Sequence, residues 1–266
     1  MKTKITQVLL ISIIGLFLSI MGCGKGKYSI TAAGSTAFQP FAEKLAEQYM
    51  QAHKDTNITI QGGGSAVGIQ SALSGAAQIG IADLVILPPE AKSLTAIIVA
   101  RDGIAIIVNP KNKINNLTLQ HIQDIYNGKM KNWKEIGGND HIITVISREA
   151  GSGTRSSFET IVKNISLTKE AIIQDSNGTV RETVINDVNA IGYLSHGLIN
   201  EKIKPVTING IPCTTDEIIK GRYILVRPIF FLTKGAPRDK IKDFIDYILS
   251  NQGQETIKSN GLIPAK

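Results

Sequence analysis

Short apolar runs alternate along the first part of the chain with segments whose apolar residues recur at helical spacing. The runs at 28–32, 58–61 and 79–82 predict strands. The segment after the first run has the periodicity of an amphipathic helix along one face: Phe38, Phe41, Ala42, Leu45 and Tyr49. Apolar residues at helical spacing also follow the second run. Strands that alternate with helices in this way are typical of a parallel α/β sheet.

The second half of the chain continues the alternation. Apolar runs at 142–146 and 191–194 predict further strands, and helices are expected from Thr168 and over 179–188. A C-terminal helix is expected to bury a face made of five apolar residues: Ile241, Phe244, Ile245, Ile248 and Leu249. The α/β pattern therefore extends over most of the chain.

Two longer apolar regions, near 100–108 and 223–232, are interpreted as crossovers between two lobes. The chain would leave the first lobe through one of them and return through the other. Lobe 1 is then expected to consist of 28–105 and 226–266, and lobe 2 of 106–225. No internal repeat or low-complexity linker contradicts this organisation.

Glycine, serine and threonine gather at three places where a predicted strand meets a predicted helix: 34–36, 62–65 and 151–153. The first turn of a helix leaves backbone N–H groups unpaired and partially positive, and glycine lets an anion approach them closely. In open α/β sheets, ligands lie at the carboxyl ends of strands. These junctions favour an anion site there, although ordinary turns before capped helices have the same composition.

The segment 147–158 contains the most specific of these junctions. Ser152 is well placed to cap the following helix, and Ser152 and Thr154 both offer hydroxyl donors. Arg148 adds a planar, permanently charged guanidinium, so the set suits a tetrahedral oxyanion. It is not a Walker A loop, because no Gly-Lys-Ser/Thr follows at the required spacing. A surface arginine beside an ordinary turn is the alternative.

Composition narrows the function classes only a little. The 266 residues carry a formal net charge of +7, with a pI of about 9.3, but the lysines are scattered and aromatic residues make up 5%. No basic run or stacking motif occurs, so a nucleic-acid partner is not expected. The four histidines show no metal-ligand spacing, and neither a metal nor a cofactor is expected: His53, His121, His141 and His196.

The N-terminus has the pattern of a secretory signal. Lys2 and Lys4 precede an apolar run over 8–21, followed by a small residue at the expected cleavage point. The run is too short to span a bilayer comfortably, because a spanning helix needs about 20 residues. We therefore expect residues 1–22 to be removed as a signal peptide, and an uncleaved anchor is the alternative.

The end of this signal, Ile20-Met21-Gly22-Cys23, resembles the lipobox of bacterial lipoproteins. That resemblance implies cleavage before Cys23 and attachment of lipid to it, with palmitate among the expected modifications. Residues 23–27 would form a tether, and the protein would be lipid-anchored to the cell membrane on its extracytoplasmic face. With Cys23 lipidated, Cys213 has no cysteine partner, so no disulfide is expected.

Segments from nearly the whole mature chain together resemble the phosphate-binding proteins of bacterial phosphate ABC transporters. Six segments carry the resemblance: 33–40, 63–69, 128–129 with 132–133, 148–155, 190–193 and 261–264. The most specific feature is Arg148 followed by Gly-Ser-Gly-Thr at 151–154. The family resemblance implies a type II periplasmic-binding-protein-like fold, in which two α/β lobes are joined by two hinge strands and close over the ligand.

The same resemblance implies a set of phosphate contacts. Carried over by motif, they are Thr36, the backbone N–H of Ala37, Ser65, Asp83, Arg148, Ser152, the backbone N–H of Gly153, and Thr154. Some relatives place an aspartate two residues after the arginine, where it orients the guanidinium. Here Ala150 stands at that position with Glu149 beside it, which leaves the support of the arginine open.

Asp83 ends the predicted strand 79–83 and is expected to give the site its chemical selectivity. A carboxylate repels a fully ionised oxyanion but accepts a hydrogen bond from one that keeps a proton. Phosphate keeps a proton at neutral pH and sulfate does not, so Asp83 is expected to disfavour sulfate. An aspartate that only caps a helix or closes a turn is the alternative.

The expected function is that of a monomeric solute-binding lipoprotein that delivers inorganic phosphate to the permease and ATPase subunits of an importer. An enzyme is not expected, because Ser152 and Thr154 have no histidine or lysine at a recognisable spacing. The alternatives are a receptor for molybdate, tungstate or sulfate, a secreted phosphoryl-transfer enzyme, and a phosphate sensor or adhesin without transport.

Overall fold

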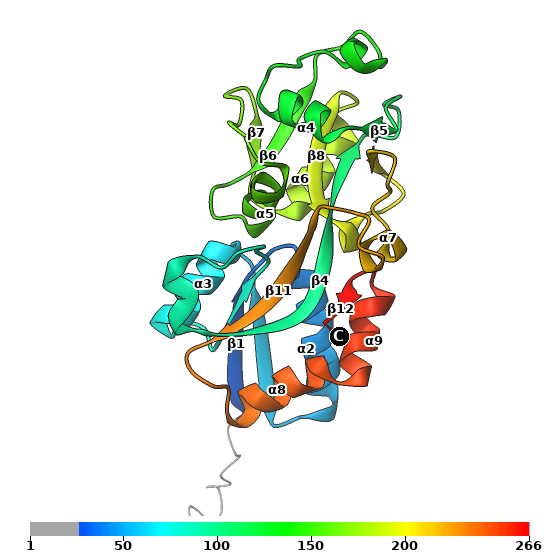
Figure 1. Cartoon of the computed structure of the whole chain (residues 1–266). Coiled ribbons are helices and arrows are strands. Elements are labelled where there is room, and N and C mark those ends of the chain that lie inside the picture. Colours follow the sequence, from blue (N-terminus) through cyan, green and yellow to red (C-terminus); the bar gives the residue numbers. More distant parts are fainter. Residues whose placement is uncertain (1–26, 266) are drawn as a thin grey trace, which may run out of the picture.

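The computed structural model describes residues 27–265 (Figure 1). The predicted signal peptide 1–22, the lipidation site Cys23 and all but the last residue of the tether 23–27 lie outside the described residues. Within residues 27–265, no helix combines the length and apolar content needed to cross a membrane.

Ten strands of the described chain form one mixed sheet that runs through both lobes. Its main path, in spatial order, is β2 (Thr56–Gln61), β1 (Tyr28–Gly34), β3 (Ile79–Ala82), β11 (Val226–Thr233), β4 (Thr95–Val108), β8 (Ala190–Ser195), β6 (Thr144–Arg148) and β7 (Ile172–Gln174). The pairs of β1 with β2 and β3 are parallel, as are those of β6 with β7 and β8. This mixed α/β sheet confirms the predicted fold class.

The strands β4 and β11 are antiparallel to their neighbours and join the lobes (Figure 1). The first part of β4, residues 95–103, pairs with β11, and its second part, residues 104–108, pairs with β8. The polar stretch Arg101-Asp102-Gly103 separates two apolar runs in the sequence, and β4 passes through it without a break. The predicted lobe boundaries at 105/106 and 225/226 stay proposals, which this change of pairing partner supports.

Helices cover the sheet on both lobes (Figure 1). Lobe 1 contains α2 (Gln39–Ala52), α3 (Ser65–Ser74), α8 (Asp239–Leu249) and α9 (Asn251–Ser259). Lobe 2 contains α4 (Leu119–Tyr126), α5 (Gly153–Val162), α6 (Asn177–Asn186) and α7 (Thr215–Ile219). Short 3-10 turns lie at Pro89–Ser93, Trp133–Ile136 and His196–Leu198. The remaining strands are β5 (Asn116–Leu117), β9 (Lys204–Pro205), β10 (Thr207–Ile208) and β12 (Ile263–Pro264).

The helix expected from Thr168 is wrong. Residues 168–171 form a turn, closed by a hydrogen bond from Ala171 N to Thr168 O, and β7 follows directly. The cause is tertiary, because Ile172 and Ile173 find partners on β6 in parallel register. Sheet pairing therefore outweighed a weak local helix signal.

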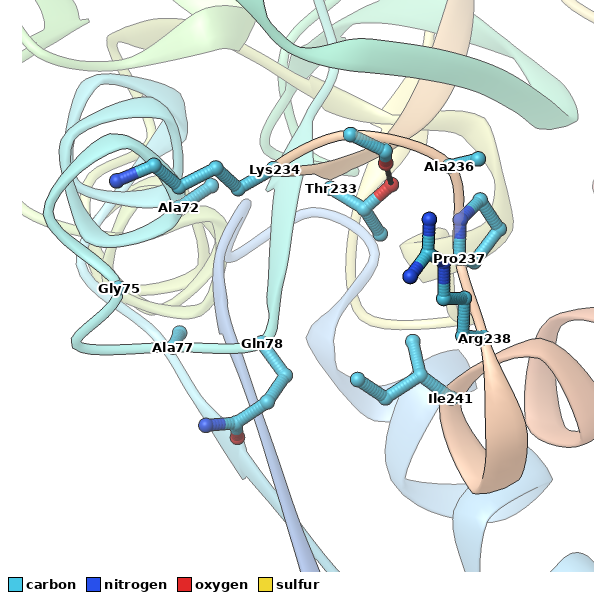
Figure 2. Close-up of a pocket in the computed structure, with 11 residues that line it drawn as sticks. Ala72, Gly75, Ala77, Gln78, Thr233, Lys234, Ala236, Pro237, Arg238 and Ile241 are labelled. Atoms are coloured by element: carbon cyan, nitrogen blue, oxygen red, sulfur yellow. Dashed lines mark hydrogen bonds between the residues drawn. The ribbon is translucent and has the colours of Figure 1, made fainter.

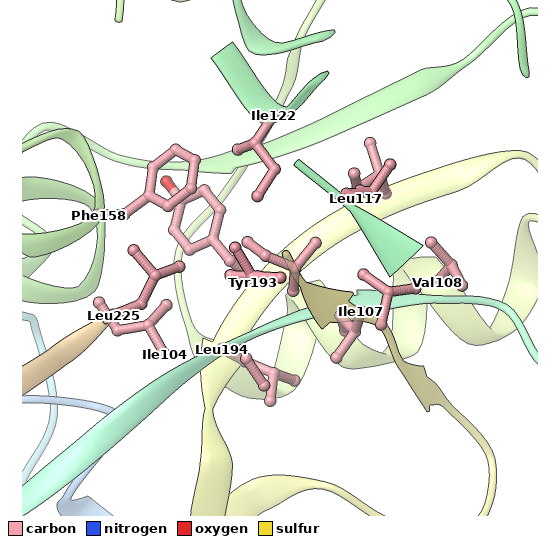
Figure 3. Close-up of a cluster of buried hydrophobic side chains, with 14 of the residues drawn as sticks. Ile104, Ile107, Val108, Leu117, Ile122, Phe158, Tyr193, Leu194 and Leu225 are labelled. Atoms are coloured by element: carbon pink, nitrogen blue, oxygen red, sulfur yellow. The ribbon is translucent and has the colours of Figure 1, made fainter. Parts of the chain in front are cut away.

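Each lobe has its own hydrophobic core. In lobe 1, the helices α2 and α8 bury Phe38, Leu45 and Phe244 against the sheet. Figure 3 shows the lobe 2 core, where Ile104 and Leu225 from the crossover strands meet Phe158 and Tyr193. Residues of the crossover strands therefore belong to both cores, and this packing holds the strands in place between the lobes. The space between the lobes is left to polar groups.

Candidate functional site

The first junction of the site lies between β1 and α2. Ser35 Oγ accepts a hydrogen bond from Phe38 N at 3.2 Å, which closes the turn at the start of the helix. Gly34 has φ +139°, and a Cβ there would lie 2.1 Å from Ile81 O. Only glycine allows this close approach of β1 to β3. The turn places Thr36, which is half-buried, and the buried Ala37 beside the interlobe space.

The second junction and the end of β3 bring Ser65 and Asp83 into contact. Ser65 Oγ donates to Asp83 Oδ1 at 2.6 Å, and Asp83 N donates back to Ser65 Oγ at 3.0 Å. Both residues are 1% exposed. Ser65 opens α3 and Asp83 directly follows β3, and the packing of α3 on β3 makes these residues neighbours. The pair fixes the carboxylate at the carboxyl edge of the sheet.

Lobe 2 supplies the opposite wall through the junction between β6 and α5. Ser152 caps α5, and its Oγ accepts from Arg155 N at 3.2 Å. Thr154 Oγ1 donates across the lobes to Asp83 Oδ2 at 3.2 Å. A Cβ on Gly153 would lie 2.1 Å from Ser65 Oγ and 2.4 Å from Asp83 Oδ1. The absence of a side chain at Gly153 therefore lets the two lobes meet.

Arg148 ends β6 and is buried, with 1% of its side chain exposed. Its Nε and Nη2 form two hydrogen bonds with the carboxylate of Glu149, at 2.9 and 2.8 Å. Its Nη2 also donates to Thr36 Oγ1 at 3.3 Å, which links the lobes. Glu149 therefore supports the guanidinium, which answers the question that Ala150 left open. Among residues 27–265, Nη1 of this arginine is buried and has no hydrogen-bond partner.

Three further hydrogen bonds connect the lobes around these groups. Ala66 N donates to Gly151 O at 3.1 Å, and Val85 N donates to Ser157 Oγ at 3.2 Å. Ser157 Oγ in turn donates to Asp83 O at 3.0 Å. Each bond joins a residue of α3 or α5 to backbone of the other lobe. The described structure is thus a closed form, in which all of the predicted site residues lie along one interlobe seam.

Asn177 is a buried polar residue of the seam that sequence reasoning missed. Its Nδ2 donates to Thr36 Oγ1 at 3.3 Å, and its Oδ1 accepts from Ser195 N at 3.0 Å. The expected helix began at Thr179, two residues too late, so Asn177 was excluded from it. The signal was Ser176, which caps α6 through a hydrogen bond from Thr179 N. Recognising that cap would have placed Asn177 at a helix start.

Arg227 and Asp102 were also missed, and both come from the crossover strands. Arg227 Nη2 lies 3.0 Å from Asp83 Oδ2 and 2.9 Å from Asp102 Oδ2. Burial raises the pKa of the Asp102 carboxyl, and the positive charge of Arg227 opposes part of that rise. Each of these charged residues interrupts an apolar run in the sequence. A charge inside such a run is the signal that could have identified them as functional candidates.

One hollow of the described structure adjoins this seam, and a second lies elsewhere in lobe 1. The first, of about 180 Å³, lies between α3 and the β6–α5 turn, and Ser65, Gly151 and Ser152 are among its lining residues. The second, of about 560 Å³, is formed by the α3–β3 turn and the segment between β11 and α8 (Figure 2). Figure 2 shows Lys234 and Arg238 at that second hollow. None of the predicted site residues lines it, so the seam remains the candidate site.

The seam can hold a small oxyanion that carries a proton. Helix starts and hydroxyls supply donors, Arg148 supplies positive charge, and Asp83 supplies an acceptor. Within the described residues, no group of three or more histidine, cysteine, aspartate or glutamate side chains could hold a metal ion. The donors and the acceptor of the seam are the kinds of group that recognise an oxyanion through hydrogen bonds.

Comparison with known proteins places this geometry in a family. A sequence model of the PBP superfamily domain matches residues 22–252. The phosphate-binding protein PstS of Bacillus subtilis is 34% identical over 251 residues, which cover 92% of this chain and 84% of the relative. That match extends over both lobes, so it concerns the whole architecture and not one motif.

Two solved structures are also similar to this chain. The first is a protein of Clostridium perfringens, assigned as a phosphate ABC transporter substrate-binding protein and solved with bound phosphate. It has a TM-score of 0.87 and 37% identity, and the match covers 90% of this chain and 100% of that one. The second, an ABC-type phosphate transport receptor from Vibrio cholerae, has a TM-score of 0.74 and 35% identity, with 88% and 99% covered.

Proposed function

Because this chain belongs to the PBP superfamily, and within it to the phosphate-binding proteins of phosphate ABC transporters, we propose that it captures inorganic phosphate between its lobes and delivers it to an importer. The relatives' names state phosphate binding and phosphate transport, and the match extends over most of this chain. The interlobe seam is the place in the fold where a tetrahedral anion meets suitable donors.

The observation that best supports the proposal is the burial and incomplete hydrogen bonding of the Arg148 guanidinium. This guanidinium is buried, held in place by Glu149, and has Nη1 without a partner among the described residues. A buried donor without a partner costs about 1–3 kcal/mol, and more for a charged group. Such a cost is offset when an anion accepts the hydrogen bond. The preorganised guanidinium therefore supports anion binding more directly than any glycine-rich turn does.

The proposed ligand set keeps every residue expected from the sequence: Thr36, Ala37 N–H, Ser65, Asp83, Arg148, Ser152, Gly153 N–H and Thr154. Roughly eight charge-assisted bonds at about 1.5–3 kcal/mol each sum to about 12–24 kcal/mol. A micromolar dissociation constant needs only about 8 kcal/mol. The remainder is consumed in dehydrating the anion and ordering the lobes. The donor set is therefore a better guide to selectivity than to affinity.

Calorimetric titration tests this proposal directly. The domain without its signal peptide and Cys23, stripped of bound anion, is titrated with phosphate, sulfate and molybdate. We expect tight phosphate binding without heat from sulfate, because Asp83 accepts the proton that only phosphate offers. Tighter binding of sulfate, molybdate or tungstate would keep the fold and replace the ligand. No heat from any of these oxyanions would refute the proposed function.

Variants of the arginine and its support sharpen the assignment. Arg148→Ala removes the buried charge, and we expect phosphate affinity to fall by about 100-fold, the range for a charged hydrogen bond. Glu149→Gln leaves the guanidinium but weakens its orientation, so a smaller loss, of about tenfold, is expected. Arg181→Ala, an arginine whose ion pair with Glu182 lies near solvent, is the control and should leave affinity unchanged.

We also propose that the protein catalyses no reaction at this site. Ser152 Oγ accepts from Arg155 N and Thr154 Oγ1 donates to Asp83, so both hydroxyls have structural partners. In the described part of the chain, neither makes a hydrogen bond with a histidine or lysine that could act as a base. We therefore propose binding without turnover. Release of phosphate from a generic phosphoester by the purified protein would contradict this.

Membrane attachment and transport partners are further parts of the proposal. The lipobox-like ending at Cys23 supports cleavage, lipidation and attachment on the extracytoplasmic face. We propose a monomer that passes phosphate to the permease of an importer driven by ATPase subunits, as the family's function implies. The full chain expressed in a bacterial host should fractionate with membranes, and Cys23→Ser should release it. A Cys23→Ser protein that stays in the membrane would favour the uncleaved anchor instead. Loss of phosphate uptake on deletion would separate a transporter subunit from a sensor or adhesin.

A further inference from the structure

Arg227 lies at the point where the two crossover strands meet the ligand-binding edge of the sheet. It sits on β11 directly opposite Asp102 on β4, in antiparallel register. Its side chain is fully buried, and so is that of Asp102. A buried charged pair between the hinge strands is therefore built into the fold, next to residue 103, where β4 changes partner from β11 to β8.

The pairing of Arg227 is unusual for a residue that only stabilises the fold. One nitrogen, Nη2, contacts both Asp83 and Asp102, at 3.0 and 2.9 Å. Among residues 27–265, its Nε and Nη1 are buried without hydrogen-bond partners. Burying such a group costs more than a well-packed apolar side chain would, so stability alone does not account for it. Its contact with Asp83 suggests a role at the ligand site.

The contacts of Asp83 divide its two oxygens between the two sides of the site. Oδ1 accepts from Ser65 and is the oxygen that a Cβ on Gly153 would meet at 2.4 Å. Oδ2 accepts from Arg227 and Thr154. With Oδ2 held toward the hinge, the rotation of the carboxylate is fixed and Oδ1 stays at the turn that presents the Gly153 N–H.

We propose that Arg227 is a positioning residue for anion selection: it holds Asp83 so that one carboxylate oxygen faces the bound anion, and it ties that carboxylate to the hinge strands. The inference rests on the proposed function, phosphate binding, and deepens it by naming what sets selectivity. The arginine itself is not placed among the phosphate ligands. Its effect on the ligand passes through Asp83.

Loss of Arg227 has a specific consequence for selectivity. Without the guanidinium, the carboxylate of Asp83 loses the contact that holds its Oδ2 toward the hinge, and it can turn away from the anion. It then no longer presents a fixed acceptor to a protonated oxyanion. Phosphate affinity falls, while sulfate has no proton to donate and loses no hydrogen bond.

The test compares phosphate and sulfate affinities of wild type, Arg227→Gln and Arg227→Lys by calorimetry. Arg227→Gln should lower the ratio of phosphate to sulfate affinity by at least about tenfold, the scale of one lost charged hydrogen bond. Arg227→Lys keeps the charge but not the planar fork, so its ratio should fall by a smaller factor, about threefold. The matched control is Arg101→Gln, an exposed arginine one residue from Asp102 on β4, whose ratio should equal that of wild type.

A purely structural role predicts a different pattern. Asp102→Asn weakens the same buried pair but leaves the contact between Arg227 and Asp83, so it should lower the melting temperature without changing the affinity ratio. If Arg227→Gln also lowers only the melting temperature, the inference is overturned. If Arg227→Gln fails to fold, Arg227→Lys serves as the test variant. An unchanged ratio of phosphate to sulfate affinity in Arg227→Lys then overturns the inference. Wild type that binds no phosphate would instead refute the proposed function.

Discussion

At the scale of single residues, the seam is made of polar side chains that hold one another in place before any ligand is considered. Ser65 fixes one oxygen of Asp83, Glu149 fixes the guanidinium of Arg148, and Asn177 holds Thr36. Arg148 Nη1 is left buried without a hydrogen-bond partner among residues 27–265. Preorganisation of this kind reduces the entropy that ligand binding has to overcome.

Gly153 is the residue at which a single methyl group should matter most. In Gly153→Ala the Cβ would lie 2.1 Å from Ser65 Oγ, too close for the lobes to meet as they do. We expect phosphate affinity to fall by about tenfold or more, because closure must be relaxed to relieve the contact. Calorimetry measures this.

Gly151→Ala, in the same turn, is the control. Its Cβ would lie 3.4 Å from Ala66 Cβ, an ordinary contact, so its affinity should stay close to that of wild type. Equal losses in both variants would mean that general stiffening of the turn, and not the contact at Gly153, causes the effect.

Asp102 predicts a pH dependence of stability with a definite sign. Burial raises the pKa of its carboxyl above the ordinary value of 3.8. The stability that such a group contributes is fully present below the unfolded-state pKa and is lost as pH rises through the folded-state pKa. Wild type should therefore lose stability relative to Asp102→Asn, which cannot ionise, as pH rises from about 4 toward neutrality. Thermal unfolding of both proteins over this range measures the difference.

Asp55→Asn provides a control of opposite sign. The hydrogen bond from Lys240 lowers the pKa of Asp55, so its contribution is present above the unfolded-state pKa and lost as pH falls. The advantage of wild type over Asp55→Asn should therefore shrink toward acid pH. A stability difference at Asp102 that shows the same trend as Asp55 would contradict the prediction.

At the scale of elements, the site is a set of strand–turn–helix junctions placed at one edge of the sheet. β1, β3 and β6 each end where a turn or helix start begins, and the parallel pairing of β1 with β3 aligns two of these ends. The antiparallel strands β4 and β11 separate the two parallel groups. The junctions of lobe 1 therefore face those of lobe 2 across the seam.

Helix capping allows the structural and binding roles of Ser152 to be separated. Ser152→Ala removes both the cap of α5 and a proposed phosphate donor, whereas Thr118→Ala removes only the cap of α4. Each lost cap should lower the free energy of unfolding by about 1 kcal/mol. Only Ser152→Ala should also weaken phosphate binding, by about tenfold or more. Chemical denaturation of both variants measures the free energy of unfolding, and calorimetry measures phosphate affinity. Equal phosphate affinities would exclude Ser152 from the ligand set.

At the scale of the whole molecule, two cores are joined by two strands, and polar contacts connect the lobes along the seam. The cores share the crossover strands and differ in the helices that cover them. The interlobe contacts are hydrogen bonds such as that from Val85 N to Ser157 Oγ. Polar seams of this kind separate at lower cost than apolar ones, because water replaces the lost partners.

Closure should therefore depend on the ligand. We expect the stripped protein to populate an open form, because Arg148 and Asp83 are then hydrated, and saturating phosphate to shift it toward the compact form described here. Small-angle scattering should show a smaller radius of gyration with phosphate. Arg148→Ala, measured under the same conditions, should show no change. Wild-type scattering that phosphate leaves unchanged would count against a hinge mechanism.

Periodicity and capping chemistry, both short-range, were enough to predict the alternating strands and helices, the α/β class and the three glycine-rich junctions. The family was identified separately, by the resemblance of six sequence segments to the phosphate-binding proteins, and the comparisons confirm it. The sequence pattern failed where strand pairing determined the structure: the helix expected from Thr168 is a turn, followed by the edge strand β7, which pairs with β6. The assignment of individual phosphate ligands stays a prediction.

The tertiary structure alone decided which charges meet. Arg227 and Asp102 lie 125 residues apart in the sequence, and only the register of β11 on β4 brings them together beside Asp83. No local signal specifies such a pair, because its partners are set by strand register and burial. The sequence determined by itself which groups are available for anion recognition. The fold determined which of them are buried, paired and directed at the seam, because burial and long-range pairing arise only once the chain has packed.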